Sequence, residues 1–149
     1  MRAPSGYRFP TEADYSGDWK EFRATVPTPF VVRADLNGDA IPDEAWLLPA
    51  SSGRGWGLFV ALGSSNGSHR WIRLERDAET DVQGFGISHV EPGQYKTACG
   101  KGYWACKRDE PALLDLKAAA FQLFKFESAS SIFWWDQPSR SFKRIWMSD

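Results

Sequence analysis

The oxygen-bearing side chains of residues 35–43 have the types and the spacing that a calcium ion requires. Four side-chain donors occupy positions 1, 3, 5 and 9 of this segment: Asp35, Asn37, Asp39 and Asp43. Ca²⁺ is a hard cation that binds several oxygen ligands in a flexible geometry, and the seventh position of such a loop supplies a backbone carbonyl. That position is Ile41. The segment is therefore predicted to bind Ca²⁺, with these five residues as ligands.

The sequence around the loop favours strands over helices. Ala40 stands where an EF-hand has Gly, and Trp46 stands where an EF-hand has a bidentate Glu. The residues that follow form two strand-like runs at 44–48 and 57–62, separated by a turn-forming stretch at 49–55. The loop is thus expected to open a β-hairpin.

Residues 33–64 resemble an FG-GAP/VCBS repeat, the calcium-loop unit of integrin-type β-propellers, in having a D-x-N-x-D-x-x-x-D loop before two strands. The resemblance covers a single copy and implies a structural ion bound by Asp35, Asn37, Asp39 and Asp43. Ala40 in place of Gly at the bend implies weaker calcium binding. The alternative is a polar turn without metal, since Asp, Asn, Gly and Pro are all common in turns.

Length and charge limit the remaining possibilities. The 149 residues are predicted to form a single domain, 1–149. Interspersed basic and acidic residues, 18 and 19 in number, give a net charge of −1, which does not favour nucleic acid or an anionic membrane surface. No apolar run is long enough for a membrane-spanning helix or a secretory signal.

Two weak signals point to a periplasmic or secreted protein whose signal peptide has been removed. A loop of modest calcium affinity is filled only where calcium is abundant. Cys99 and Cys106 are the only cysteines, and a disulfide between them would close a short glycine-containing loop. Reduced thiols in a cytoplasmic protein are the alternative. The cysteine spacing excludes a C-x-x-C redox motif and gives no support to a zinc site.

The chain as a whole is predicted to be mostly β, with antiparallel sheets or hairpins arranged as a propeller blade or a sandwich, and with a short N-terminal helix. The helix is expected to begin at 11–14 and to run toward Pro27. Strands are expected at 30–34, 71–76 and 85–90, and the run 112–126 is interpreted as rich in strands. A hairpin is expected at 131–147 around a Pro-Ser turn.

Eight tryptophans could serve a core or a binding surface. Trp134 and Trp135 are adjacent, so on a strand they would face opposite sides. The tip of the disulfide loop is the better candidate for a contact, because a cross-linked loop loses less entropy on binding. The residues expected to contact a partner are Lys101, Tyr103, Trp104 and Trp134.

No recognised catalytic set accompanies these features. Gly63-Ser64-Ser65-Asn66-Gly67 matches G-x-S-x-G in letters only, because a nucleophile elbow needs a strand followed by a helix. The leading hypothesis is a non-catalytic, extracytoplasmic calcium-binding domain that binds a protein partner, as an inhibitor or immunity protein of a bacterial secreted toxin or hydrolase. The alternatives are a carbohydrate-binding module with exposed Trp and, third, a calcium-supported hydrolase.

Overall fold

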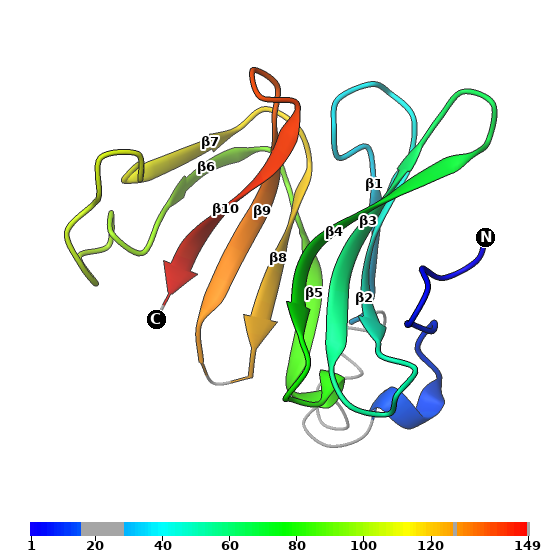
Figure 1. Ribbon diagram of the computed structural model, residues 1–149. Coiled ribbons are helices and arrows are strands. Elements are labelled where there is room, and N and C mark those ends of the chain that lie inside the picture. Colours follow the sequence, from blue (N-terminus) through cyan, green and yellow to red (C-terminus); the bar gives the residue numbers. More distant parts are fainter. Residues whose placement is uncertain (16–28, 127, 149) are drawn as a thin grey trace.

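Antiparallel strands dominate the computed structural model, which describes residues 1–15, 29–126 and 128–148 (Figure 1). Ten strands are present: β1 (Val31–Ala34), β2 (Asp43–Pro49), β3 (Trp56–Gly63), β4 (His69–Asp77), β5 (Phe85–Val90), β6 (Gly93–Lys96), β7 (Leu113–Leu116), β8 (Ala120–Lys125), β9 (Ser130–Asp136) and β10 (Ser141–Ser148). The same described residues also form two short 3-10 helices, η1 (Glu12–Tyr15) and η2 (Val82–Gly84).

The first sheet is a simple meander in the order β1-β2-β3-β4. Its central strand, β3, is buried along almost its whole length, because both of its faces are covered. Leu58, Val60 and Leu62 enter the main core cluster. On the opposite face, the ring of Phe59 packs against Tyr7 of the N-terminal segment, with ring centroids 4.8 Å apart.

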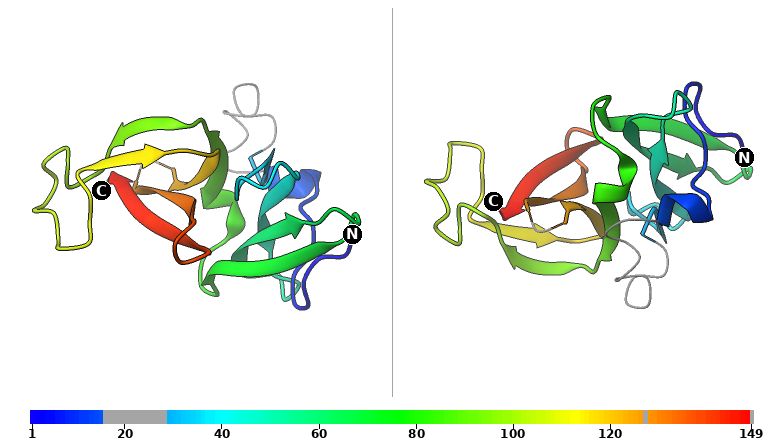
Figure 2. Two further views of the ribbon diagram at one scale, coloured as in Figure 1. Left: turned by 90° about the horizontal axis from the view of Figure 1, so that it is seen from above. Right: turned by 90° about the horizontal axis from the view of Figure 1, so that it is seen from below.

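The second sheet has the order β10-β9-β8-β5, so that the strand following the meander pairs with the later strand β8. Phe121, Leu123 and Phe133 of this sheet belong to the same core cluster as the apolar side chains of the meander. The two four-stranded sheets lie side by side along the molecule, with the chain ends on opposite sides (Figure 2).

A third, two-stranded sheet of β6 and β7 packs on the other face of the second sheet. A separate apolar cluster lies at this contact and includes Leu114 and Leu116 from β7 together with Ile132 and Ile145 from the second sheet. The loop that joins β6 to β7 contains both cysteines.

The N-terminal segment pairs with the meander through a bridge between Tyr7 and Ala50, and an ion pair within the segment stabilises its shape. Arg8 donates two hydrogen bonds of 2.9 Å to the carboxylate of Asp14, which is 5 % exposed. The backbone N–H of Thr11 donates to the same carboxylate at 2.7 Å. Burial alone would raise the pKa of Asp14, but the hydrogen bonds from Arg8 and Thr11 hold that pKa below its ordinary value.

The prediction of a mostly β, antiparallel fold is confirmed, and every predicted strand run contains a strand. The predicted N-terminal helix is only the 3-10 turn Glu12–Tyr15, and the rest of that prediction, 16–27, lies outside the described residues. Strand β6 was not predicted. The described part of the chain contains no helix with the length and apolar character needed to cross a membrane.

Candidate metal centre and disulfide loop

The predicted calcium loop forms the turn between β1 and β2, at one end of the meander. Its three carboxylates converge: oxygen atoms of Asp35, Asp39 and Asp43 all lie within 4.8 Å of one another. Asp43 is fully buried, Asp35 is half-buried and Asp39 is exposed. The site therefore has a buried base and an open side through which a cation could enter.

The carboxylate of Asp35 organises the turn. One of its oxygens accepts hydrogen bonds from the backbone N–H groups of Gly38, at 2.8 Å, and Asp39, at 3.2 Å, while the other accepts from Ala40 at 2.7 Å. Both Gly38 and Ala40 have positive φ, 78° and 65°. Since a side chain makes the left-handed conformation unfavourable, Ala40 stores strain at the position where Gly would be relaxed.

Asp43 joins the loop to the core. Its carboxylate accepts hydrogen bonds from the backbone N–H groups of Leu36, at 2.8 Å, and Gly63, at 2.9 Å. Gly63 has to be glycine, because a Cβ there would lie 2.3 Å from the carbonyl oxygen of Pro42. This close approach brings the end of β3 against the loop of residues 35–43.

The same burial makes Asp43 an unfavourable place for an uncompensated negative charge. Burial raises the pKa of Asp43 above its ordinary value, although the two backbone donors oppose the shift. The negative charges of Asp39 and Asp35 add to the rise. A divalent cation between the three carboxylates would offset both the desolvation and the repulsion.

The two remaining predicted ligands have other contacts in this structure. The side-chain oxygen of Asn37 accepts a hydrogen bond of 3.4 Å from the backbone N–H of Asp39, and the backbone N–H of Ile41 donates to the Asp39 carboxylate at 2.9 Å. Sequence reasoning missed Gln137, whose side-chain N–H₂ donates to the backbone carbonyl of Asn37 at 2.8 Å. Nothing in the local pattern around Gln137 indicates this contact, since the two residues are 100 positions apart.

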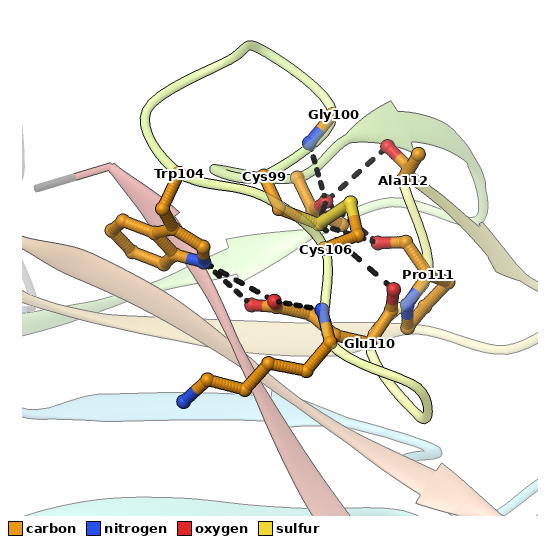
Figure 3. The surroundings of a disulfide bond; sticks show 9 residues. Cys99, Gly100, Trp104, Cys106, Glu110, Pro111 and Ala112 are labelled. Atoms are coloured by element: carbon orange, nitrogen blue, oxygen red, sulfur yellow. Dashed lines mark hydrogen bonds between the residues drawn. A yellow bond between two sulfur atoms is a disulfide. The ribbon is translucent and has the colours of Figure 1, made fainter.

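Cys99 and Cys106 form the predicted disulfide (Figure 3). The loop it closes is organised around the buried hydroxyl of Thr97. That hydroxyl donates to the carbonyl oxygen of Pro111 at 2.7 Å and accepts from the backbone N–H of Gly100 at 3.2 Å. A Cβ at Gly100 would lie 2.0 Å from the carbonyl oxygen of Ala112, so the two ends of the loop touch.

The disulfide loop is also hydrogen-bonded to the last strand, β10. The backbone N–H of Ala98 donates to the carbonyl of Trp146 at 2.9 Å, and the ammonium group of Lys101 donates to the carbonyl of Met147 at 2.9 Å. Lys101 was predicted as a partner contact, and the structure shows that its side chain holds the loop on β10. Tyr103 is 57 % exposed at the loop tip.

The two tryptophans among the predicted partner residues are partly buried. The indole N–H of Trp104 donates to both carboxylate oxygens of Glu110, at 3.1 and 3.0 Å (Figure 3). Trp134 and Trp135 face opposite sides of the second sheet, as predicted: Trp134 packs against the cluster beneath β6 and β7, and Trp135 against the main core. Sequence reasoning did not single out Trp146, which is 38 % exposed.

The segment 63–67 that matches G-x-S-x-G in letters begins at the last residue of β3 and forms part of the turn leading into the antiparallel strand β4. The backbone N–H of Ser64 donates to the carbonyl of Ser68 at 3.0 Å across this turn. The strand-to-helix context of a nucleophile elbow is therefore absent at this serine.

Comparison of the chain with known protein families, with curated proteins and with solved structures gives no match.

Proposed function

We propose that this protein is a non-catalytic, extracytoplasmic calcium-binding domain that acts by binding another protein. The observation that carries the metal part is the convergence of three carboxylates, from Asp35, Asp39 and Asp43, around one point at the end of the meander. A fully buried member of the triad supports a structural ion, because that carboxylate also ties the loop to β3. The resemblance of residues 33–64 to an FG-GAP/VCBS repeat supports the same role.

Two features support action by protein binding in an oxidising compartment. A disulfide is kept where the surroundings are oxidising, as they are in the periplasm and outside the cell. The cross-linked loop presents the exposed ring of Tyr103 and is fixed to β10 by Lys101, which makes it a rigid contact surface. An inhibitor or immunity protein of a secreted toxin or hydrolase works in an oxidising compartment and needs a rigid contact surface. We propose this as the biological role.

The experiment that tests the metal site is thermal unfolding in EDTA against millimolar Ca²⁺, without reductant. A ligand that binds only the folded state raises its stability by mass action, by about 1.4 kcal/mol for a dissociation constant of roughly 10⁻⁴ M at millimolar calcium. The midpoint is expected to rise by a few degrees. Asp39→Asn, which keeps the size of the side chain and removes its charge, is expected to abolish the calcium-dependent rise.

The matched control is Asp81→Asn, which removes an exposed carboxylate outside the triad. This variant is expected to respond to calcium as the wild type does. Equal midpoints of the wild type in EDTA and in calcium would show that residues 35–43 form only a polar turn. A pull-down from the extracellular fraction of the native source, in calcium buffer, then tests the partner: a single protein retained through washing supports the proposal.

Carbohydrate binding is the second candidate, because Trp134 and Trp135 border a hollow of about 340 Å³ beside the metal loop. Asn37 and Pro138 line the same hollow, so an indole ring, an amide and a metal site lie next to one another. Calorimetric titration with soluble cell-wall glycans separates the candidates. Glycan binding that is lost in Trp134→Ala would favour the carbohydrate-binding module over the protein-binding domain.

A further inference from the structure

The sequence contains two Asn-Gly pairs, and both lie in turns of the meander. Asn37-Gly38 belongs to the loop of residues 35–43, and Asn66-Gly67 lies at the tip of the hairpin formed by β3 and β4 (Figure 1). In such a pair the backbone nitrogen of Gly can attack the side-chain amide of Asn, because Gly has no side chain to obstruct the approach. The two pairs are chemically identical, so their surroundings decide which one reacts.

The side chain of Asn66 is folded over its own turn. Its carbonyl oxygen, Oδ1, accepts a hydrogen bond of 2.9 Å from the backbone N–H of Ser68. A hydrogen bond to the N–H two residues further on closes an Asx turn. The ring closed in this way includes the peptide bond to Gly67, so the side-chain carbonyl carbon is bent toward the nitrogen of Gly67.

Two hydroxyl groups donate to the same oxygen. The hydroxyl of Ser68 donates to Oδ1 of Asn66 at 2.7 Å, and the hydroxyl of Ser64 donates to it as well. Negative charge develops on this oxygen when a nucleophile attacks the carbonyl carbon, and donors already in place stabilise that charge. At Asn37, among the described residues, Oδ1 accepts a single hydrogen bond, of 3.4 Å from the N–H of Asp39.

The charge beside the attacking nitrogen also differs between the two pairs. The N–H of Gly38 donates to the carboxylate of Asp35 at 2.8 Å. Loss of the proton there would place two negative charges side by side, which is unfavourable. The N–H of Gly67 donates at 3.0 Å to the neutral carbonyl of Ser64, and Gly67 lines a surface hollow together with Arg2. The nitrogen of Gly67 is therefore the easier one to deprotonate.

Access to water favours the hairpin tip as well. Asn66 and Gly67 are both exposed, whereas Asn37 is half-buried. A Cβ added at Gly67 would have nothing within 4 Å, whereas one at Gly38 would lie 3.6 Å from the side-chain nitrogen of Gln137. Hydroxide and water can thus approach the hairpin tip from open solvent.

We propose that Asn66 is a modification site, at which the chain converts itself to aspartate and isoaspartate through a cyclic imide. Hydroxide removes the proton of the Gly67 nitrogen, and this nitrogen bonds to Cγ of Asn66 while the C=O electron pair moves to Oδ1. When that pair returns, the Cγ–Nδ2 bond breaks, and Nδ2 takes a proton from water and leaves as ammonia.

Water then opens the imide ring in one of two ways. Cleavage of the bond between the Gly67 nitrogen and Cγ gives aspartate with an ordinary main chain. Cleavage of the bond between that nitrogen and the backbone carbonyl carbon gives isoaspartate, whose main chain runs through Cβ and Cγ. In total one water is consumed and one ammonia is released, and no oxidant or reductant is needed.

Both products change the tip of the hairpin. Each adds a carboxylate, and isoaspartate also lengthens the main chain inside a turn that is closed by the hydrogen bond from Ser64 N–H to the Ser68 carbonyl at 3.0 Å. This modification goes beyond the proposed calcium and protein binding, because Asn66 lies outside both the loop of residues 35–43 and the disulfide loop.

The test follows both asparagines in one sample. The full chain is incubated in mildly alkaline buffer with EDTA, digested at intervals and analysed by mass spectrometry, which detects the gain of about 1 Da when NH₂ is replaced by OH. Asn66 is expected to react at least about tenfold faster than Asn37 in the folded protein. In guanidinium chloride, where the fold is lost, the two rates are expected to be similar. Equal rates in the folded protein would overturn the proposal.

The role of the hydroxyl donors is tested with Ser64→Ala/Ser68→Ala. This double variant is expected to modify Asn66 about tenfold more slowly than the wild type, because two donors to the developing oxyanion are lost. The matched control is Ser65→Ala, at an exposed serine of the same turn, and it is expected to keep the wild-type rate. Modification of the double variant at the rate of Ser65→Ala or faster would overturn the proposal.

Discussion

Two residues of the loop 35–43 have opposite effects on its folded shape: Asp43 stabilises it and Ala40 destabilises it. Asp43 is buried and doubly hydrogen-bonded, so it stabilises the junction of the loop with β3. Ala40 lies in the left-handed region at φ 65° and opposes the folded turn. The loop therefore holds its shape through side-chain hydrogen bonds to the backbone, in spite of an unfavourable residue at the bend.

Ala40→Gly is expected to stabilise the protein both with and without calcium. Glycine relieves the left-handed strain of a side chain, which costs about 1 kcal/mol, and part of the gain is offset by the greater freedom of glycine in the unfolded chain. Urea unfolding in EDTA and in calcium measures the change. Ala78→Gly, at an exposed alanine outside the positive-φ residues, is the control and is expected to bring no gain. A lower free energy of unfolding for Ala40→Gly than for the wild type would contradict this view of the bend.

Among the elements, the disulfide loop depends on a hydroxyl as much as on its cross-link. Thr97 is fully buried, and its hydroxyl connects the N–H of Gly100 to the carbonyl of Pro111. The disulfide limits how far the loop can open, whereas this hydroxyl decides which shape the closed loop takes. The position of the loop on β10 follows from that shape.

Thr97→Val is expected to lower the free energy of unfolding by about 1–3 kcal/mol, because the isosteric methyl group leaves a buried donor and a buried acceptor without their partner. Thr97→Ser, which keeps the hydroxyl, is expected to lose less. Chemical denaturation without reductant compares the two variants. Equal stabilities for Thr97→Val and the wild type would show that the hydrogen bonds of the hydroxyl are dispensable.

On the scale of the whole molecule, long-range polar contacts connect parts that do not share a sheet. The indole N–H of Trp71 in β4 donates to the backbone carbonyl of Arg2 in the N-terminal segment at 3.0 Å, and Arg144 of the second sheet pairs with Glu75 of the first at 2.8 Å. Gln137 connects the turn between β9 and β10 to the loop of residues 35–43. These polar contacts join surface segments that the hydrophobic clusters do not hold together.

The ion pair of Asp14 makes stability depend on pH in a defined direction. Its pKa is lowered in the folded state, so its contribution is complete above the ordinary pKa of Asp and is lost as the pH falls through the lower, folded value. Asp14→Asn is expected to be destabilised by about 1 kcal/mol near neutral pH, and its difference from the wild type should vanish in acid. Urea unfolding from neutral pH to below the ordinary pKa of Asp measures this, with Asp81→Asn as control. A gap that persists unchanged in acid would contradict a role for the carboxylate charge.

Local sequence patterns were sufficient to predict most strands and the convergence of the carboxylates. The run from Trp56 to Gly63 is apolar and β-forming, and the three carboxylates that converge lie within nine residues of one another in the sequence. Strand β6 was missed because Gly93-Gln94-Tyr95-Lys96 has neither an apolar run nor a clear alternation. Gln137 and Arg144 were missed for another reason: their partners, Asn37 and Glu75, lie 100 and 69 positions away, and no local pattern encodes such a contact.

The charges beside the edge of β10 have a consequence for self-association. An uncovered edge strand offers its backbone to a second copy of the same strand, which is the usual start of sheet-to-sheet aggregation. Lys143 and Arg144 lie at the middle of β10, so two copies pairing there would bring like charges together. Lys143 and Arg144 thus disfavour the pairing of β10 with the same strand of a second molecule.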